Sequence, residues 1–211
     1  VGLLFGSTSL AVAGERIAQE NLSHIHGLAP DSSHPGSLFV ATHHGLFRAD
    51  PDGTAEKISQ GSDDLMGFSP VPGSPGKFLA SGHPPKGGNL GVIASGDGGV
   101  TWSQVSPGNN GPVDFHAMDI SKADPKVIYG NFAKIQVSRN GGLTWTMMSQ
   151  APEGLIALAA GAKDARTLYA ATKTGLLVSR DGAQSWSRAH PSNAPVSSVL
   201  VMADATVYAF L

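Results

Sequence analysis

An eight-residue pattern occurs three times in this chain, and it limits the possible folds more than any other feature. The copies span Ser95–Trp102, Ser138–Trp145 and Ser179–Trp186, and their serines are 43 and 41 residues apart. A fixed period near 40 residues means that one supersecondary unit is used repeatedly. The architecture therefore has to be inferred from the repeated unit.

Each copy of the pattern predicts a tight turn between two strands. A short apolar run precedes every serine, as in Val92-Ile-Ala94, and is typical of a strand. The Asp-Gly-Gly or Asn-Gly-Gly tip tolerates positive φ, and its Asp or Asn side chain can accept hydrogen bonds from the turn. The tryptophan begins the returning strand and is expected to fill the blade interior. All three tryptophans of the chain occupy this slot, which favours a structural role.

Two further sets of short apolar strands keep the same period. One set carries an aromatic residue in each unit: Phe39, Phe78, Tyr129, Tyr169 and Tyr208. The other set precedes it, at residues 25–28, 65–68, 115–118, 155–158 and 195–200. Each unit thus contains four short strands, which is the pattern of a β-propeller blade. We predict an all-β propeller of four-stranded antiparallel blades, with about four blades and part of a fifth.

The serine-to-tryptophan pattern resembles the Asp-box, or BNR repeat, of sialidase-like, sortilin-type and photosystem-assembly-factor-like propellers. Ser95–Trp102 matches it fully, whereas the second copy has Asn140 for Asp and the third has Ala183 and Ser185 for Gly and Thr. The first blade carries only a degenerate version, at residues 49–53, without tryptophan. The resemblance extends from about residue 22 onward and implies the fold. It leaves the function open, because one fold supports many functions.

Three segments are expected along the chain. Residues 1–13 look like the end of a secretory signal peptide, because an apolar run leads into the small-residue site Ala11-Val-Ala13. Residues 14–21 are expected to be a linker, and residues 22–211 the propeller, which is expected to be incomplete at its C-terminus. We therefore expect export to a periplasm or to the cell exterior. The chain has no cysteine, which excludes disulfides and thiolate metal sites.

Composition narrows the classes of partner. The net charge of −2 provides no basic field for nucleic acid or an anionic membrane. The apolar run at the start is too short for a membrane span, and the Gly-Gly pairs lie in predicted hairpins. We expect a monomer that binds a protein or glycan partner at one rim of the propeller, with copper or zinc as the candidate cofactor.

The sialidase resemblance implies an arginine triad and an acidic pair, and neither is visible in this sequence. Two of the six arginines, Arg139 and Arg180, lie in the predicted outer turns, and none of the four glutamates lies on an inner strand. We therefore expect no catalytic residue in this chain and a non-catalytic binding module. A glycoside hydrolase remains an alternative that two convergent carboxylates at the channel would support. An assembly or scaffold factor that uses its outer surface is a second alternative.

The histidines offer the most specific chemistry. His26 and His116 occupy the same slot of the predicted inner strands, and Met66 holds that slot in the second blade. Because side chains alternate along a strand, these three are expected to converge from adjacent blades. A second set follows the aromatic strands of the first two blades and is expected at one rim: His43, His44 and His83.

These six residues are the candidate metal ligands. Imidazole with thioether suits copper, and imidazole alone suits zinc, copper or nickel, so copper or zinc is the expected ion. Asp114 and Asp119 flank His116 and are candidates for further ligands or for hydrogen-bond acceptors behind it. The competing interpretation is that the histidines are hydrogen-bonded structural residues and that Met66 fills the core.

Overall fold

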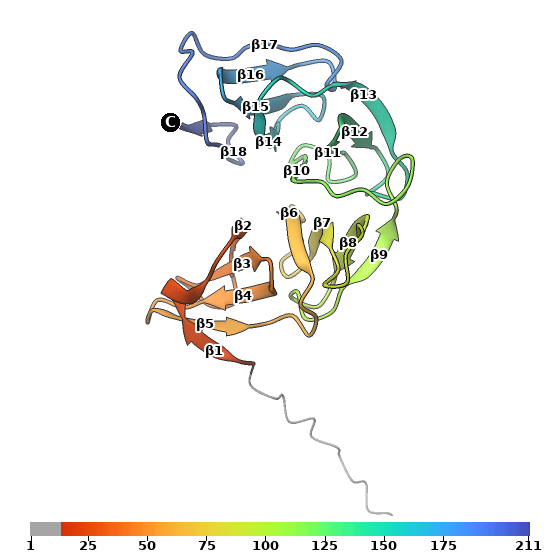
Figure 1. Ribbon diagram of the computed structural model, residues 1–211. Helices are drawn as coiled ribbons and strands as arrows, with labels where there is room; N and C mark the ends of the chain where they lie inside the picture. Colours follow the sequence, from red (N-terminus) through yellow and green to blue (C-terminus); the bar gives the residue numbers. More distant parts are fainter. Residues whose placement is uncertain (1–13) are drawn as a thin grey trace, which may run out of the picture.

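The computed structural model describes residues 14–211, so the predicted signal peptide lies outside the described residues. The sheets follow one another around an arc, with one edge strand of each sheet toward its inner side (Figure 1). The predicted all-β propeller is confirmed: four blades of four antiparallel strands are followed by a two-stranded fifth sheet.

From the inside outward the strands keep chain order, except that the first strand of the chain lies outermost in the first sheet. Blade 1 contains β2 (Ile25–Pro30), β3 (Leu38–Thr42), β4 (Gly45–Ala49) and β5 (Thr54–Lys57). Blade 2 contains β6 (Asp64–Pro70), β7 (Phe78–His83), β8 (Val92–Ser95) and β9 (Ser103–Ser106). Blade 3 contains β10 (Ala117–Ile120), β11 (Ile128–Phe132), β12 (Lys134–Ser138) and β13 (Thr146–Gln150). Blade 4 contains β14 (Leu155–Ala160), β15 (Leu168–Thr172), β16 (Gly175–Ser179) and β17 (Ser187–Arg188), and the fifth sheet pairs β18 (Ser198–Val201) with β19 (Val207–Phe210).

Residues 14–21 are part of the first blade, whereas the sequence led us to expect a linker. Strand β1 (Arg16–Ala18) pairs antiparallel with β5, and a short 3-10 turn, η1 (Gln19–Asn21), follows it. The Gln19 amide donates to the carbonyls of Asp50 and Thr54, at 2.5 and 3.1 Å, which fastens the segment to the blade. This added strand covers the outer edge of blade 1, an edge that would otherwise expose unpaired backbone groups.

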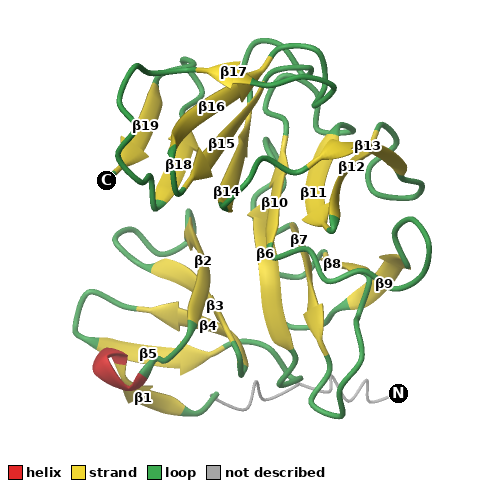
Figure 2. Cartoon of the chain, turned by 45° about the horizontal axis from the view of Figure 1, so that its top comes forward, coloured by secondary structure: helices red, strands yellow, loops and turns green. Residues whose placement is uncertain are grey.

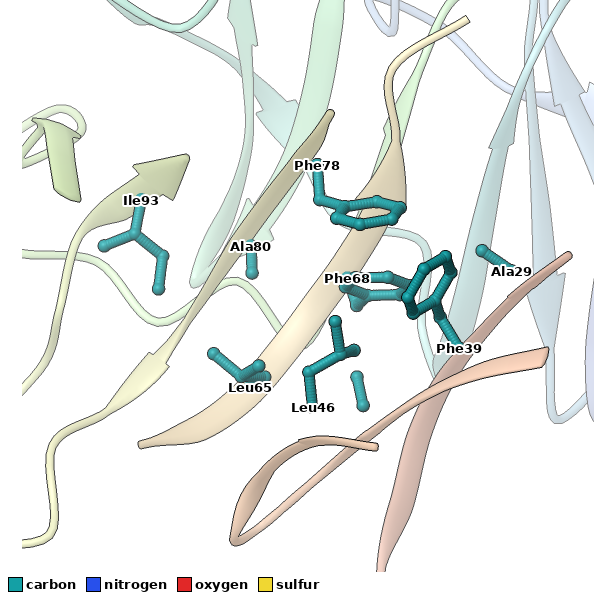
Figure 3. Close-up of a cluster of buried hydrophobic side chains, with 9 residues drawn as sticks. Ala29, Phe39, Leu46, Leu65, Phe68, Phe78, Ala80 and Ile93 are labelled. Carbon is teal, nitrogen blue, oxygen red and sulfur yellow. The ribbon is translucent and has the colours of Figure 1, made fainter. Parts of the chain in front are cut away.

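The apolar cores lie at the junctions between blades. At the first junction, Phe39 and Leu46 of blade 1 meet Phe68 and Phe78 of blade 2 (Figure 3). Trp102 packs against this same cluster. Equivalent clusters occupy the next three junctions.

The tryptophans belong to these junctions, which corrects the expectation that they fill the blade interior. Trp145 of blade 3 is buried against Phe115 and donates its indole N–H to Ser106 Oγ of blade 2, at 3.1 Å. Trp186 of blade 4 likewise faces Ser149 Oγ of blade 3, at 3.3 Å. The repeated tryptophan therefore joins its own blade to the preceding one.

Each eight-residue turn is closed by its own side chains. In the first copy, Ser95 Oγ donates to Asp97 Oδ1 at 2.8 Å and accepts from the Gly99 N–H at 2.9 Å. The Thr101 N–H donates to the same carboxylate at 3.0 Å. Asn140 and Asp181 accept the corresponding bonds in the other two copies. The structural role predicted for this pattern is thus visible as a self-contained hydrogen-bond network.

Candidate functional site

The predicted ligands lie where inner strands begin and second strands end. In an antiparallel pair, the start of one strand lies beside the end of its neighbour, so β2 with β3 and β6 with β7 bring these points to the same end of the sheets. The inner strands β2, β6 and β10 stand beside one another in the fold (Figure 2). Histidine and aspartate side chains gather there in two groups.

The first group joins blades 1 and 2 and consists of His26, His43 and Asp64. The His26 Nε2 atom lies 3.4 Å from Asp64 Oδ1, and the His43 Nε2 atom lies 3.6 Å from Asp64 Oδ2. The rings of His26 and His43 stack with their centroids 4.6 Å apart, and the ring centroids of His24 and His43 lie 4.4 Å apart. Three imidazoles and one carboxylate therefore share this corner.

The second group joins blades 2 and 3 and consists of His83, Asp114 and His116. Asp114 Oδ2 accepts hydrogen bonds from both imidazoles, at 2.9 Å from His83 Nε2 and 2.5 Å from His116 Nε2. The other ring nitrogen of His83 lies 2.8 Å from the carbonyl oxygen of Gly88. Both nitrogens of His83 thus face acceptors, an arrangement that favours the protonated ring.

The two groups are neighbours. Asp64 of the first group is the cross-strand partner of His83 of the second group, in the pairing of β6 with β7. The groups therefore form one continuous band of imidazoles and carboxylates over the first three blades.

Three atoms of this band are buried without a hydrogen-bond partner: His26 Nε2, Asp64 Oδ1 and Asp114 Oδ1. An unsatisfied buried polar group costs about 1–3 kcal/mol, and native proteins seldom leave one unexplained. Each of these atoms has a free lone pair or proton that a bound ion or water would satisfy. The band thus has unused binding capacity.

Burial and neighbouring charges act differently on the two groups. Burial lowers the pKa of His26, and the Asp64 carboxylate opposes that shift only in part. The hydrogen bond to the Gly88 carbonyl raises the pKa of His83, with the Asp114 carboxylate adding to the effect. Burial thus favours the neutral form of the His26 imidazole, which is the form that binds metals.

The structure brings the predicted ligands together in a different combination from the expected one. His26 pairs with His43, and His116 pairs with His83. Met66 is buried and lines, with His26 and His116, a hollow of about 890 Å³ along the inner strands. His44 is exposed and belongs to neither group.

Asp64 was missed by the sequence analysis, although the repeat carries a signal for it. The residue immediately before each apolar inner-strand run is His24 in blade 1, Asp64 in blade 2 and Asp114 in blade 3. Aligning this slot across these three blades finds a ligand-type side chain in each, whereas blade 4 has Gly154 there.

Asp119, the other carboxylate considered as a ligand, lies outside both groups. It accepts hydrogen bonds from the backbone N–H groups of Ile120 and Ala160, and burial raises its pKa.

The fold and this band define a β-propeller with a histidine-bearing inner end. The match to solved structures agrees with that class. A GH74 enzyme from Niastella koreensis superposes with a TM-score of 0.65 at 14% identity, over 94% of this chain and 33% of that one. The nidogen/laminin complex superposes with a TM-score of 0.62 at 15% identity, over 88% of this chain and 71% of that one. YCF48 bound to D1 peptide superposes with a TM-score of 0.59 at 14% identity, over 94% of this chain and 64% of that one.

These similarities concern the fold alone, because all three identities are low. The chain spans 27–35% of the length of the three GH74 enzymes that it matches. No protein-family model and no curated protein matches the sequence. Within residues 14–211, no helix is long and apolar enough to cross a membrane.

Proposed function

We propose that this chain forms part of an exported, non-catalytic propeller that binds a copper or zinc ion at the histidine-bearing end of its inner strands. The observation that carries the proposal is the convergence of His26, His43 and Asp64, and of His83, Asp114 and His116, with three buried donor or acceptor atoms left unpaired. Neutral imidazole and carboxylate are suitable ligands for both ions. Export rests on the signal-peptide pattern of residues 1–13.

A titration with zinc and with copper tests this function. The wild-type chain should bind either ion stoichiometrically, and the double variant His26→Ala/His116→Ala, which removes one imidazole from each group, should lose the tight binding. The matched control is His34→Ala/His190→Ala, since those histidines lie outside both groups. Equal binding by the two double variants, or no stoichiometric binding by the wild type, would contradict the proposal.

The glycoside hydrolase alternative has less support among the described residues. Glycosidases ordinarily need two carboxyl groups across the scissile bond. The hollow along the inner strands is lined by one carboxylate, Asp119, which already accepts two backbone hydrogen bonds. Asp64 and Asp114 lie among imidazoles. Hydrolysis of xyloglucan or a sialoside by the purified chain would restore this alternative.

Partner binding is a second candidate function, and exposed apolar side chains on the inner strands favour it. Leu28 is 56% exposed and Ile156 is 42% exposed, and both line the hollow. Two of the structural neighbours were solved with a protein or peptide partner. A partner that co-purifies with the wild type should be lost from Leu28→Asp/Ile156→Asp. It should be retained by Leu143→Asp, which alters an equally exposed leucine on an outer turn.

A further inference from the structure

We propose that the two groups are unequal, and that the blade 1–blade 2 group binds one zinc or copper(II) ion first, with His24 as its fourth ligand beside His26, His43 and Asp64. This inference rests on the proposed metal-binding function and assigns the order of occupancy and the complete ligand set. The bound ion would also link blade 1 to blade 2.

The spacing of the donor atoms in the first group fits a shared ion. Two ligand atoms at about 2.0–2.1 Å from a tetrahedral ion lie about 3.4 Å from each other. The His26 Nε2 to Asp64 Oδ1 distance is 3.4 Å, and the His43 Nε2 to Asp64 Oδ2 distance is 3.6 Å. Direct hydrogen bonds would be about 2.7–3.2 Å long. These atoms are therefore close enough to bind one ion and too far apart to bond well to one another.

The unpaired atoms point to the same group. Both His26 Nε2 and Asp64 Oδ1 are buried and lack a hydrogen-bond partner. One cation between them would satisfy the imidazole lone pair and the carboxylate oxygen together. No existing hydrogen bond of these two atoms would have to break.

The second group is already paired. Asp114 Oδ2 bonds both His83 and His116, and His83 is held on its other side by the Gly88 carbonyl. An ion there would have to replace two of these hydrogen bonds, and Asp114 Oδ1 is the one unpaired atom of the group. The second group is consequently the weaker site.

His24 lies beside the first group. Its backbone has φ of +52°, which is unusual for a residue other than glycine and is often found at functional sites. Its ring lies against that of His43, with centroids 4.4 Å apart, and its side chain is exposed. The His24 nitrogens lie outside the group as it stands, so the inference requires a rotation of this exposed side chain to bring one of them to the ion. His24 also occupies the repeat slot that holds Asp64 and Asp114 in the next two blades.

The ligand set selects the class of ion. Three imidazoles with one carboxylate make a site of nitrogen and oxygen donors, which suits zinc and copper(II) rather than copper(I), an ion that prefers sulfur. The ligands come from β2, from the residue before it and from the β3–β4 turn of blade 1, and from β6 of blade 2. Binding should therefore raise the unfolding temperature by tying the two blades together.

The test uses two matched pairs of variants of the full chain, titrated with zinc and with copper(II). Asp64→Asn and Asp114→Asn each replace one carboxylate by its isosteric amide. Asp64→Asn should lower the affinity for the first ion by more than the roughly 10–100-fold that loss of an outer-sphere partner costs. Asp114→Asn should leave the affinity for the first ion unchanged and lower only the affinity for the second ion.

The second pair is His24→Ala and His44→Ala, two exposed histidines of which only His24 is proposed as a ligand. His24→Ala should lower the affinity for the first ion about 10-fold or more. It should also reduce the number of nitrogen ligands seen in the electron paramagnetic resonance spectrum of bound copper(II). His44→Ala should change neither. Identical behaviour of the two variants would remove His24 from the ligand set.

The outcomes separate this inference from the proposed function. Loss of the first ion in Asp114→Asn, with binding intact in Asp64→Asn, would overturn the order of occupancy and leave the metal-binding function in place. Absence of stoichiometric binding by the wild type would overturn both. Thermal unfolding without metal shows whether each variant is folded, and a metal-induced rise in the unfolding temperature that persists in Asp64→Asn would also count against the inference.

Discussion

The outer turns and the inner histidine end of this propeller follow opposite rules. In the turns, the same hydrogen bonds recur in three blades, and Asp97, Asn140 and Asp181 are interchangeable acceptors. At the inner end, the shared slots do not keep one residue type, since His24 stands where the next blade has Asp64, and buried polar atoms remain unpaired. Features that repeat build the blade, and features that break the repeat are the place to look for function.

The largest expected effect of breaking an outer-turn feature is on stability. Trp145→Ala should lower the free energy of unfolding by about 3–5 kcal/mol, as a large-to-small change at a packed junction, because Trp145 is 6% exposed and donates to Ser106 of the preceding blade. Urea denaturation measures this loss. Metal affinity of the folded fraction should be unchanged, and unaltered stability would mean that the tryptophan does not hold the junction together.

Replacing each of two equivalent turn glycines by alanine shows how the same change acts in two different turns. Gly99 and Gly142 have φ of +88° and +89°, where alanine costs about 1–2 kcal/mol. A Cβ on Gly99 would also overlap the buried Leu46 side chain, whereas the nearest atom to one on Gly142 is 3.6 Å away. Gly99→Ala should therefore destabilise by about 1–3 kcal/mol more than Gly142→Ala. Equal losses by chemical denaturation would contradict the close approach to blade 1.

The inner end should behave in the opposite way. His26→Ala removes a buried nitrogen that has no hydrogen-bond partner, so in the presence of a chelator its stability should stay within about 1 kcal/mol of wild type. Its affinity for the first ion should fall sharply. A large loss of stability without metal would mean that His26 is a structural residue, and Asp97→Ala, which removes bonds to Ser95 and Thr101, provides the structural reference.

The smallest expected effect is a change in how stability depends on pH. Hydrogen bonds from Ser185, and then from Ser179, hold the pKa of Asp181 well below its ordinary 3.8. A carboxylate with a lowered folded pKa stabilises the fold above the unfolded pKa, and that contribution is lost as the pH falls through the folded value. Asp181→Asn should accordingly be slightly less stable than wild type at pH 7, with a gap that narrows below about pH 4.

Asn140 supplies the matched control for the acid experiment. It makes the equivalent turn without a charge, so Asn140→Asp should introduce the acid sensitivity that Asp181→Asn removes. Melting temperatures between pH 7 and pH 2 measure both changes. Parallel pH profiles for the two variants would show that turn carboxylates do not contribute to the pH dependence.

The repeat made the fold predictable, because period, turn chemistry and strand pattern all specify the same unit. The placement of the tryptophans between blades was not predictable, since the pattern of one blade carries no information about which neighbour covers its face. Strand β1 was missed for a related reason: Arg16–Ala18 is too short to show alternation and is held by contacts with residues about 40 positions away.

The candidate site was predictable in its residues and not in its combinations. Repeat phase identified His26 and His116 as equivalent, but the pairing of each imidazole depends on which neighbouring blade supplies the carboxylate. Asp64 begins the inner strand β6 and lies beside the histidines of blade 1 only after the blades pack. Grouping of this kind is decided by tertiary contacts between units that are individually regular.

The apolar clusters between blades also imply that stability is distributed as coupling between neighbours. A blade whose junction is opened exposes the face of the next, so unfolding should spread along the arc from a weakened junction, as in a linear array of coupled units. Hydrogen exchange would then show protection that rises and falls junction by junction. An ion bound across the first junction would strengthen one link of that array and leave the others as they are.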